Sequence, residues 1–148
     1  MPQLTENEIL ALLHGPIIAR LATVTERGTP YIAPVWQTWD EGAMYIIPRA
    51  GARFVAHIEA NPAVAVSCAD DVNPDHRRIL IEGQADIIDG PALMSSDTLA
   101  IATEMAKRYG GQEGLEYLNA SLHKPRYRIR IVPSTITSWR GAWHPRYE

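Results

Sequence analysis

The chain has 148 residues, of which 46% are hydrophobic and 21% are charged, a balance typical of one soluble globular domain. Its 14 basic and 17 acidic residues give a net charge of −3, which argues against a nucleic-acid or anionic-membrane partner. The single cysteine, Cys68, excludes an internal disulfide, and its place in the apolar run AVAVSCA predicts a buried core residue.

A helix is predicted at the N-terminal end, because Thr5 to Glu8 form a capping-box pattern and apolar residues follow at helical spacing up to Leu13. The first residues lack the basic region and long apolar core of a signal peptide. No apolar stretch approaches the roughly 18 residues that a membrane-spanning helix needs. We therefore expect a cytoplasmic protein.

Three β-rich segments come next and are separated by polar, glycine-containing turns. We predict strands at 17–25, 30–39 and 43–48, followed by a short helix at 52–60. Because these turns are too short for a crossover connection, the strands must pair in the antiparallel sense.

The second half predicts a buried strand at 63–69, a polar loop at 70–76 and a long strand at 78–88. A helix is expected to start at Asp89-Gly90-Pro91 and run to about residue 109, with a brief helix at 115–119. Two last strands are predicted at 127–132 and 136–139. The sequence thus predicts a single, mainly β domain over 1–148, a barrel of six to seven antiparallel strands with peripheral helices.

Two arginines stand where the third strand passes into the short helix. Arg53 lies in the first helical turn and Arg49 just before it, and a helix start favours anions through its free N–H groups and dipole. His57, four residues after Arg53, could reinforce such an anion site, although a solvent-facing histidine is the simpler interpretation. Alternatively, both arginines are surface residues that pair with Glu59 or Asp70.

The segment 34–39 alternates two kinds of face. Val35, Gln37 and Trp39 point one way, while Pro34, Trp36 and Thr38 point the other. One face must be core, and an amide such as Gln37 could read the imide edge of a flavin-like ring. An ordinary half-buried strand explains the pattern equally well.

The five histidines lack the spacing of a metal site, so we expect no metal. The C-terminal part is rich in arginine and tryptophan, and its residues are Arg126, Arg128, Arg130, Trp139, Arg140, Trp143 and Arg146. Such a segment, and the tail 139–148 in particular, is expected to pack on its own barrel or on a partner subunit. The alternating arginines at 126–130 predict either a basic groove or a solvated strand face.

Four stretches in this order resemble the pyridoxamine 5′-phosphate oxidase-like flavin-binding split-barrel superfamily. They are ARLATVTERGTPYIAPVWQTW, AMYIIPRAGARFVAHIEANPAVAVS, RILIEGQADII and RIRIVPSTITSW. The resemblance extends over 17–139 and implies a split β-barrel that forms a homodimer, with cofactors in grooves at the subunit interface.

The resemblance also implies which residues bind the cofactor. The strand with Val35, Trp36 and Gln37 would line its ring, and the segment with Ile47, Pro48, Arg49, Arg53 and Phe54 would hold its phosphate. Arg53 falls on the family's phosphate-binding arginine, whereas Phe54 stands where a lysine is frequent, which leaves Arg49 or His57 as substitutes. Trp139 and Trp143, if the second subunit supplies them, would cap the ring or shape the substrate pocket.

The function implied is an FMN-dependent oxidoreductase that transfers hydride between bound FMN and a small planar substrate. WRGAWHPRY does not match the substrate-binding end of the true pyridoxamine phosphate oxidases, which argues against vitamin B6 oxidation. Alternatives are a reductase that uses the deazaflavin coenzyme F420, a non-catalytic module that binds flavin or haem, and a structural dimer without ligand. No side chain is predicted to be catalytic itself, because the cofactor supplies the electron chemistry.

Overall fold

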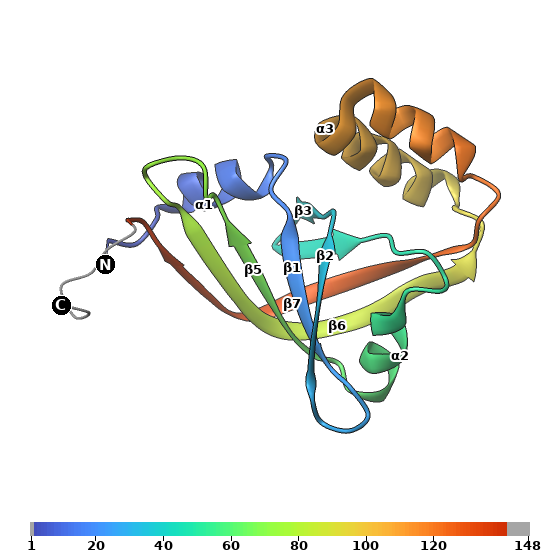
Figure 1. The fold of residues 1–148 in the computed structure, drawn as a ribbon, viewed down its shortest axis with the longest axis horizontal. Coiled ribbons are helices and arrows are strands. Elements are labelled where there is room, and N and C mark those ends of the chain that lie inside the picture. The colour runs from blue at the N-terminus through green and yellow to red at the C-terminus, as the bar shows by residue number, and fades with distance from the viewer. Residues whose placement is uncertain (1, 142–148) are drawn as a thin grey trace.

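The computed structural model describes residues 2–141 (Figure 1). In these residues the chain forms one sheet with strand order β2-β1-β5-β6-β7-β4-β3, and every recorded pairing is antiparallel. The strands are β1 Ala19–Val24, β2 Pro30–Val35, β3 Thr38–Asp40, β4 Ala43–Ile46, β5 Ala63–Ala69, β6 Arg78–Ala92 and β7 Arg126–Trp139. The helices are α1 Glu6–Leu13, α2 Arg53–Ala60 and α3 Ser96–Ala120. The predicted mainly β, antiparallel architecture is confirmed.

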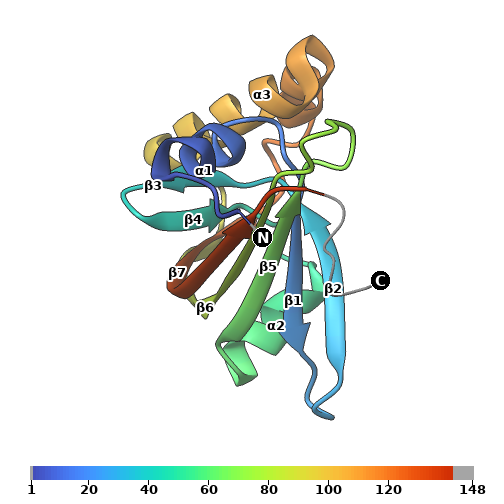
Figure 2. The same ribbon diagram turned by 90° about the vertical axis from the view of Figure 1, so that its left-hand side faces the viewer.

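The sheet curls without closing, as in a split barrel. Its two ends are β2 and β3, and Figure 2 shows the strands arranged around a common interior with α1 above one opening. The interior is filled by fully buried side chains of alternating strand residues, such as Leu21, Ile81 and Ile131. Cys68 is also fully buried in this core, as predicted.

The predicted strand at 30–39 is interrupted. β2 ends at Val35 and β3 begins at Thr38, so Trp36 and Gln37 lie outside the ladder. The backbone N–H of Gln37 donates to the hydroxyl of Tyr109 (3.3 Å), and its carbonyl accepts from Nη2 of Arg108 (2.5 Å). Side chains of α3 therefore satisfy the backbone groups that strand pairing would otherwise satisfy.

The helix expected from Asp89 begins later. β6 continues to Ala92 because it still pairs with β7, and a Cβ at Gly90 would lie 2.3 Å from the carbonyl oxygen of Arg126. Ser95 then caps α3 by accepting a hydrogen bond from the N–H of Thr98.

The two helices predicted at 91–109 and 115–119 are two limbs of α3. They meet at Gly111, whose φ of +54° and ψ of −133° break the helix and favour glycine. The limbs lie so close that a Cβ at Gly114 would be 2.1 Å from the carbonyl oxygen of Ala106. Figure 1 shows the resulting helical hairpin beside the sheet.

The two strands predicted at 127–132 and 136–139 are one continuous strand, β7. It pairs with β6 along nearly its whole length, and a register shift at Glu82 and Gly83 accommodates Pro133. A proline lacks the N–H of a regular ladder, so an irregular pairing position suits it.

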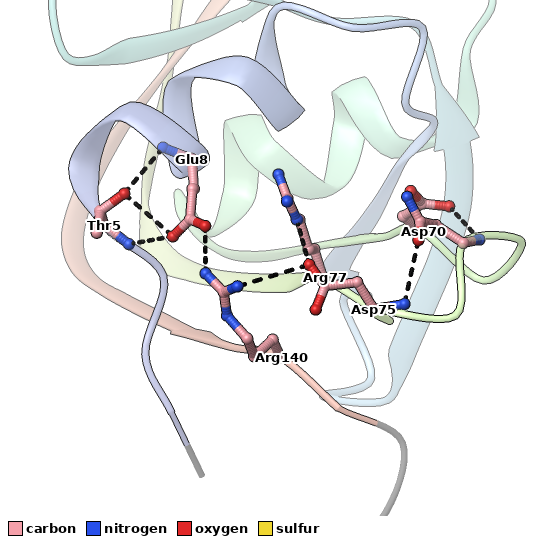
Figure 3. Close-up of polar contacts among 7 residues, drawn as sticks. Thr5, Glu8, Asp70, Asp75, Arg77 and Arg140 are labelled. Carbon is pink, nitrogen blue, oxygen red and sulfur yellow. Dashed lines mark hydrogen bonds and ion pairs between the residues drawn. The ribbon is translucent and has the colours of Figure 1, made fainter.

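The two ends of the described chain meet at one polar cluster (Figure 3). Thr5 and Glu8 form the predicted capping box of α1, and Glu8 also binds Arg140 just after β7. Arg140 contacts Asp75 in the loop after β5 (3.7 Å), which links three distant segments. Among the residues that the structure describes, no helix is long and apolar enough to cross a membrane.

Candidate functional site

A cavity of about 1040 Å³ lies between the sheet and α3. Three segments form its walls: the end of β2 with Trp36, the stretch from Ile46 to Phe54 that joins β4 to α2, and both limbs of α3. Lys124, Pro125 and Arg126, which lead into β7, complete it. The site is thus assembled from residues far apart in the sequence.

One end of the cavity is cationic. Arg49, Lys124 and Arg126 line it, and Glu113 is the acidic residue among its described lining. The backbones of Arg49 and Arg126 pair in an isolated bridge, and the N–H of Ala50 donates to the carbonyl of Pro125 (3.0 Å). This backbone pairing holds the two guanidinium-bearing residues side by side.

The positions of these guanidinium groups are fixed by further hydrogen bonds. Arg126 donates from Nη1 to the carbonyl of Ile47 (3.2 Å) and from Nη2 to Oγ of Ser121 (3.0 Å). Arg49 donates from Nη2 to the hydroxyl of Tyr117 (2.5 Å), and its guanidinium carbon lies 5.3 Å from the centre of that ring. Both cations are therefore oriented before any ligand binds.

The start of α2 lies at the same end. Gly51 and Ala52 line the cavity, and the N-cap Ala52 has no side chain that could accept a hydrogen bond from the first turn. Uncapped N–H groups at a helix start attract an anion. This helix end reinforces the charge of the arginines.

The remaining walls are apolar and held rigidly. Trp36 stacks on Tyr109, with ring centres 5.2 Å apart and planes 3° from parallel, and it meets Tyr117 edge-on at 6.4 Å. Met105, Ala106 and Leu118 of α3 are buried residues of the cavity lining. Such walls suit a flat, apolar ring system.

Six of the ten residues predicted to bind a cofactor line this cavity. They are Val35, Trp36, Ile47, Pro48, Arg49 and Phe54. The other four, Gln37, Arg53, His57 and Trp139, are not among the lining residues. The structure therefore places the segments at 35–36 and 47–54 on one cavity, but it does not bring all ten side chains together there.

Gln37 points into the core. Its side chain is fully buried, and Nε2 donates to the carbonyl of Leu13 (2.7 Å). The predicted alternation of 34–39 is correct, because Val35 and Trp39 also pack in this core while Trp36 faces α3. Gln37 therefore belongs to the core face, and within this subunit it is not placed to read a ring edge.

Arg53, which is exposed, and His57, which is buried, both lie against Tyr31 and not in the cavity. The guanidinium of Arg53 lies 5.0 Å from the ring centre of Tyr31, and His57 meets the same ring edge-on at 5.1 Å. His57 is 6% exposed and shares a 2.9 Å hydrogen bond with Oγ1 of Thr23. The expectation of a solvent-facing histidine is wrong, because α2 presses this side of its surface against β1 and β2. The pairing of the two arginines with Glu59 or Asp70 is not found either.

Trp139 ends β7, the strand that Arg126 begins. At roughly 3.3 Å per residue, the two residues are about 40 Å apart along the strand. Within one subunit Trp139 therefore cannot reach the cavity. Trp143 and Arg146, which belong to the same arginine- and tryptophan-rich C-terminal segment, lie outside the described residues.

Sequence reasoning missed the contribution of α3. Tyr117, Met105 and the small residues that face Trp36 carried no recognisable motif. For Arg126 the available signal was its alternation with Arg128 and Arg130, which predicts either a basic groove or a solvated strand face. The phenol of Tyr117 is affected by its place: partial burial acts to raise its pKa, but the guanidinium groups of Arg126 and Arg49 outweigh burial and lower the pKa below its ordinary value.

Metal binding has no visible basis in the described part of the chain, where no three His, Cys, Asp or Glu residues gather closely enough to hold an ion. The lining instead combines apolar walls with a cationic end, which suits a ligand with an apolar body and an anionic group.

Comparison with known proteins gives a consistent result. The family model described as pyridoxamine 5′-phosphate oxidase matches residues 5–140. An F420 reductase of known structure is similar with 26% identity and a TM-score of 0.67, covering 92% of this chain and 98% of its own. No curated protein sequence is significantly similar to the chain.

Two further structures share the fold at lower identity. A FAD-binding protein from Mesorhizobium loti is 15% identical with a TM-score of 0.71, over 96% of this chain and 97% of its own. The haem storage protein HutZ from Vibrio cholerae is 18% identical with a TM-score of 0.70, over 94% and 98%. The fold thus occurs in proteins whose ligands differ.

Proposed function

Because the chain belongs to the pyridoxamine 5′-phosphate oxidase-like family, we propose that it is an oxidoreductase that binds a phosphate-bearing flavin in the cavity between the sheet and α3. FMN is the first candidate for this flavin. The observation that carries this proposal is the pairing of an apolar cavity with a cationic end. Arg49, Lys124 and Arg126 stand there beside the uncapped start of α2.

The residues present fit such a cofactor in size and in chemistry. Ligand pockets commonly measure about 300–1,000 Å³, so a cavity of about 1040 Å³ has room for a tricyclic ring and a second small molecule. The lining away from the cations is mostly apolar, which suits the ring, and the cations suit a phosphate. The family resemblance implies Arg53 as the phosphate-binding arginine. Because Arg53 stacks on Tyr31, we propose Arg49 and Arg126 for this role.

When bound, a flavin supplies hydride transfer to or from a substrate. The chain's own residues would hold and orient it. Arg49 and Arg126 would fix the phosphate through charge-assisted hydrogen bonds, and Trp36, backed by Tyr109, would shield the ring from water. A small planar substrate is proposed to occupy the remaining apolar space beside Met105 and Ala106 of α3.

A homodimer and a cytoplasmic location complete the proposal. The dimer is proposed from the family resemblance, and in it Trp139, which ends the strand that begins at the cavity, would come from the second copy. Its indole would then cover the ring of the neighbouring subunit.

A second candidate cofactor is the deazaflavin coenzyme F420. Arg126 at the cavity is followed on the same face of β7 by Arg128, which lies over Tyr45, and Arg130, which reaches Asp86 (3.4 Å). This row of cations leads away from the cavity and would suit a long anionic tail. The similarity to an F420 reductase supports the same choice.

A haem-binding role has less support. A histidine ligand would be needed, and His57, the residue considered for it, is buried under α2 and bonded to Thr23. The described lining of the cavity contains no histidine. Haem is therefore the outcome we expect the binding test to exclude.

The test is a titration of the purified full-length protein with FMN, coenzyme F420 and haem, followed by absorbance and fluorescence. Arg49→Met and Arg126→Met should each weaken binding of the true cofactor about 10- to 100-fold, since hydrogen bonds to charged groups contribute about 1.5–3 kcal/mol. Arg53→Met is the matched control and should change affinity less than threefold. Binding that depends on Arg53 and not on Arg49 or Arg126 would move the site to α2, and no binding of any of the three would refute the proposal.

A further inference from the structure

Tyr117 has no role in the proposed binding of the ring and is not among the residues that the family resemblance implies. It nevertheless lies at the cationic end of the cavity. It lies on the second limb of α3 and is 46% exposed, with its ring edge against Trp36. It is the one tyrosine among the described lining residues. Its position is therefore specific to the way α3 folds over this site.

The hydrogen bonding of the phenol leaves its proton free. Its oxygen accepts a hydrogen bond from Nη2 of Arg49 at 2.5 Å, and the guanidinium of Arg126 also lowers the pKa of the phenol. Within residues 2–141 no acceptor is recorded for the O–H of Tyr117. A phenol both donates and accepts, so this group still has a donor to offer to a ligand.

The charged residues around Tyr117 favour an anionic ligand. Arg49, Lys124 and Arg126 carry three positive charges on the cavity lining, and Glu113, from the preceding turn of α3, carries the opposing one. Arg49 and Lys124 are exposed and Arg126 is half-buried, so this surplus of positive charge attracts an anion by simple Coulomb attraction. The three donors Arg49, Arg126 and Tyr117 converge from three separate elements on the same place.

We propose that Tyr117 is a ligand-binding residue, whose phenol donates a hydrogen bond to the phosphate that Arg49 and Arg126 hold. This inference rests on the proposed function and adds a specific consequence. A phosphate bound there would link the second limb of α3 to the segment at Arg49.

The same geometry allows one rival interpretation, which has the opposite sign. If Tyr117 were ionised at neutral pH, its phenolate would itself neutralise Arg49 and Arg126 and would repel a phosphate. Removing the hydroxyl would then strengthen phosphate binding, whereas our proposal requires that binding weaken. The sign of the effect decides between them.

The experiment compares FMN with riboflavin, which carries the same ring without the phosphate, on the full chain and on Tyr117→Phe. We expect FMN binding to weaken about tenfold and riboflavin binding to change less than twofold. Tyr45→Phe is the matched control, because Arg128 lies 5.3 Å from the ring centre of Tyr45 outside the cavity, and both affinities should be retained. If F420 is the cofactor, it and its phosphate-free chromophore replace the two flavins.

A second readout needs no ligand. Absorbance at about 295 nm follows phenol ionisation, and the difference between the two apo proteins should show one tyrosine that titrates below the usual value near 10. FMN affinity of the full chain should fall as pH rises through that transition, and the Tyr117→Phe protein should not show this loss.

Each other outcome overturns the inference. Equal weakening of FMN and riboflavin would assign Tyr117 to packing, and unchanged or tighter FMN binding would remove its hydrogen bond to phosphate. If the unaltered protein binds none of these molecules, the proposed function fails and this inference fails with it. Thermal unfolding of both variants, expected within a few degrees of the unaltered protein, separates these results from misfolding.

Discussion

Arg108 provides the sharpest test of how α3 is held against the sheet. Its side chain is only 11% exposed and reaches from the first limb of α3 into the barrel. Nη1 donates to the carbonyls of Leu13 (3.2 Å) and Gly15 (3.3 Å), and Nη2 donates to the carbonyl of Gln37 (2.5 Å). One guanidinium thus joins α3, the end of α1 and the break between β2 and β3.

Arg108→Met keeps most of the apolar stem but removes these three hydrogen bonds to backbone carbonyls and a fourth from Nη2 to the carboxylate of Glu104 (3.3 Å). Each bond to a charged group contributes about 1.5–3 kcal/mol, and rehydration of the freed carbonyls returns part of this, so we expect a loss of about 3 kcal/mol. For a domain of this size the melting temperature should fall by roughly 6–12 °C. Because α3 forms one wall of the cavity, cofactor affinity should fall in the same variant.

The measurement is chemical denaturation followed by circular dichroism, with two companion variants. Lys107→Met, at an exposed position on the same helix, should change stability by less than about 0.5 kcal/mol. Arg108→Lys keeps the charge but not the planar fork of donors, so its loss should be intermediate. A change below about 0.5 kcal/mol in Arg108→Met would show that this residue does not anchor α3.

Three further predictions concern other parts of the molecule. Gly114→Val should open the α3 hairpin, because even its Cβ would lie 2.1 Å from the carbonyl oxygen of Ala106, and limited proteolysis should then cut within α3 before the barrel unfolds. The pKa of Glu8 is lowered from 4.5 to about 2, mainly by the backbone N–H of Thr5 and then by Arg140, so its stabilisation is complete above pH 4.5 and is lost as pH falls towards 2; Glu8→Gln should flatten the acid side of a plot of melting temperature against pH. Burial raises the pKa of Cys68 to about 12, so a thiol reagent at pH 8 should react only at the rate of unfolding, and fast reaction of the folded protein would contradict this.

Local patterns in the sequence predicted those features whose cause is local. The capping box at Thr5 and Glu8 gives α1 because the two partners are three residues apart. The turn before β2 forms at Gly28, whose φ of +77° favours glycine. Cys68 is buried because it belongs to the apolar run AVAVSCA, which forms an inner strand of the sheet.

The tertiary structure alone decided which residues share the cavity. Arg49 and Tyr117 are 68 residues apart and Ile47 and Arg126 are 79 apart, so no spacing in the sequence relates them. Arg53 and His57 follow Arg49 on the same short segment, yet α2 turns them towards Tyr31. Helical rotation and strand pairing determine where a side chain points, and both depend on contacts between distant segments.

A segment that favours an anion could be predicted from Arg49 and the helix start, because charge and backbone polarity act over a few residues of chain. The partners of Arg49 could not, since Arg126 reaches it through the pairing of two separate strands and Tyr117 through the fold of α3 at Gly111. Local pattern thus predicted a cationic segment next to a helix start, while the packing of the helical hairpin on the sheet decided which residues line the cavity with it.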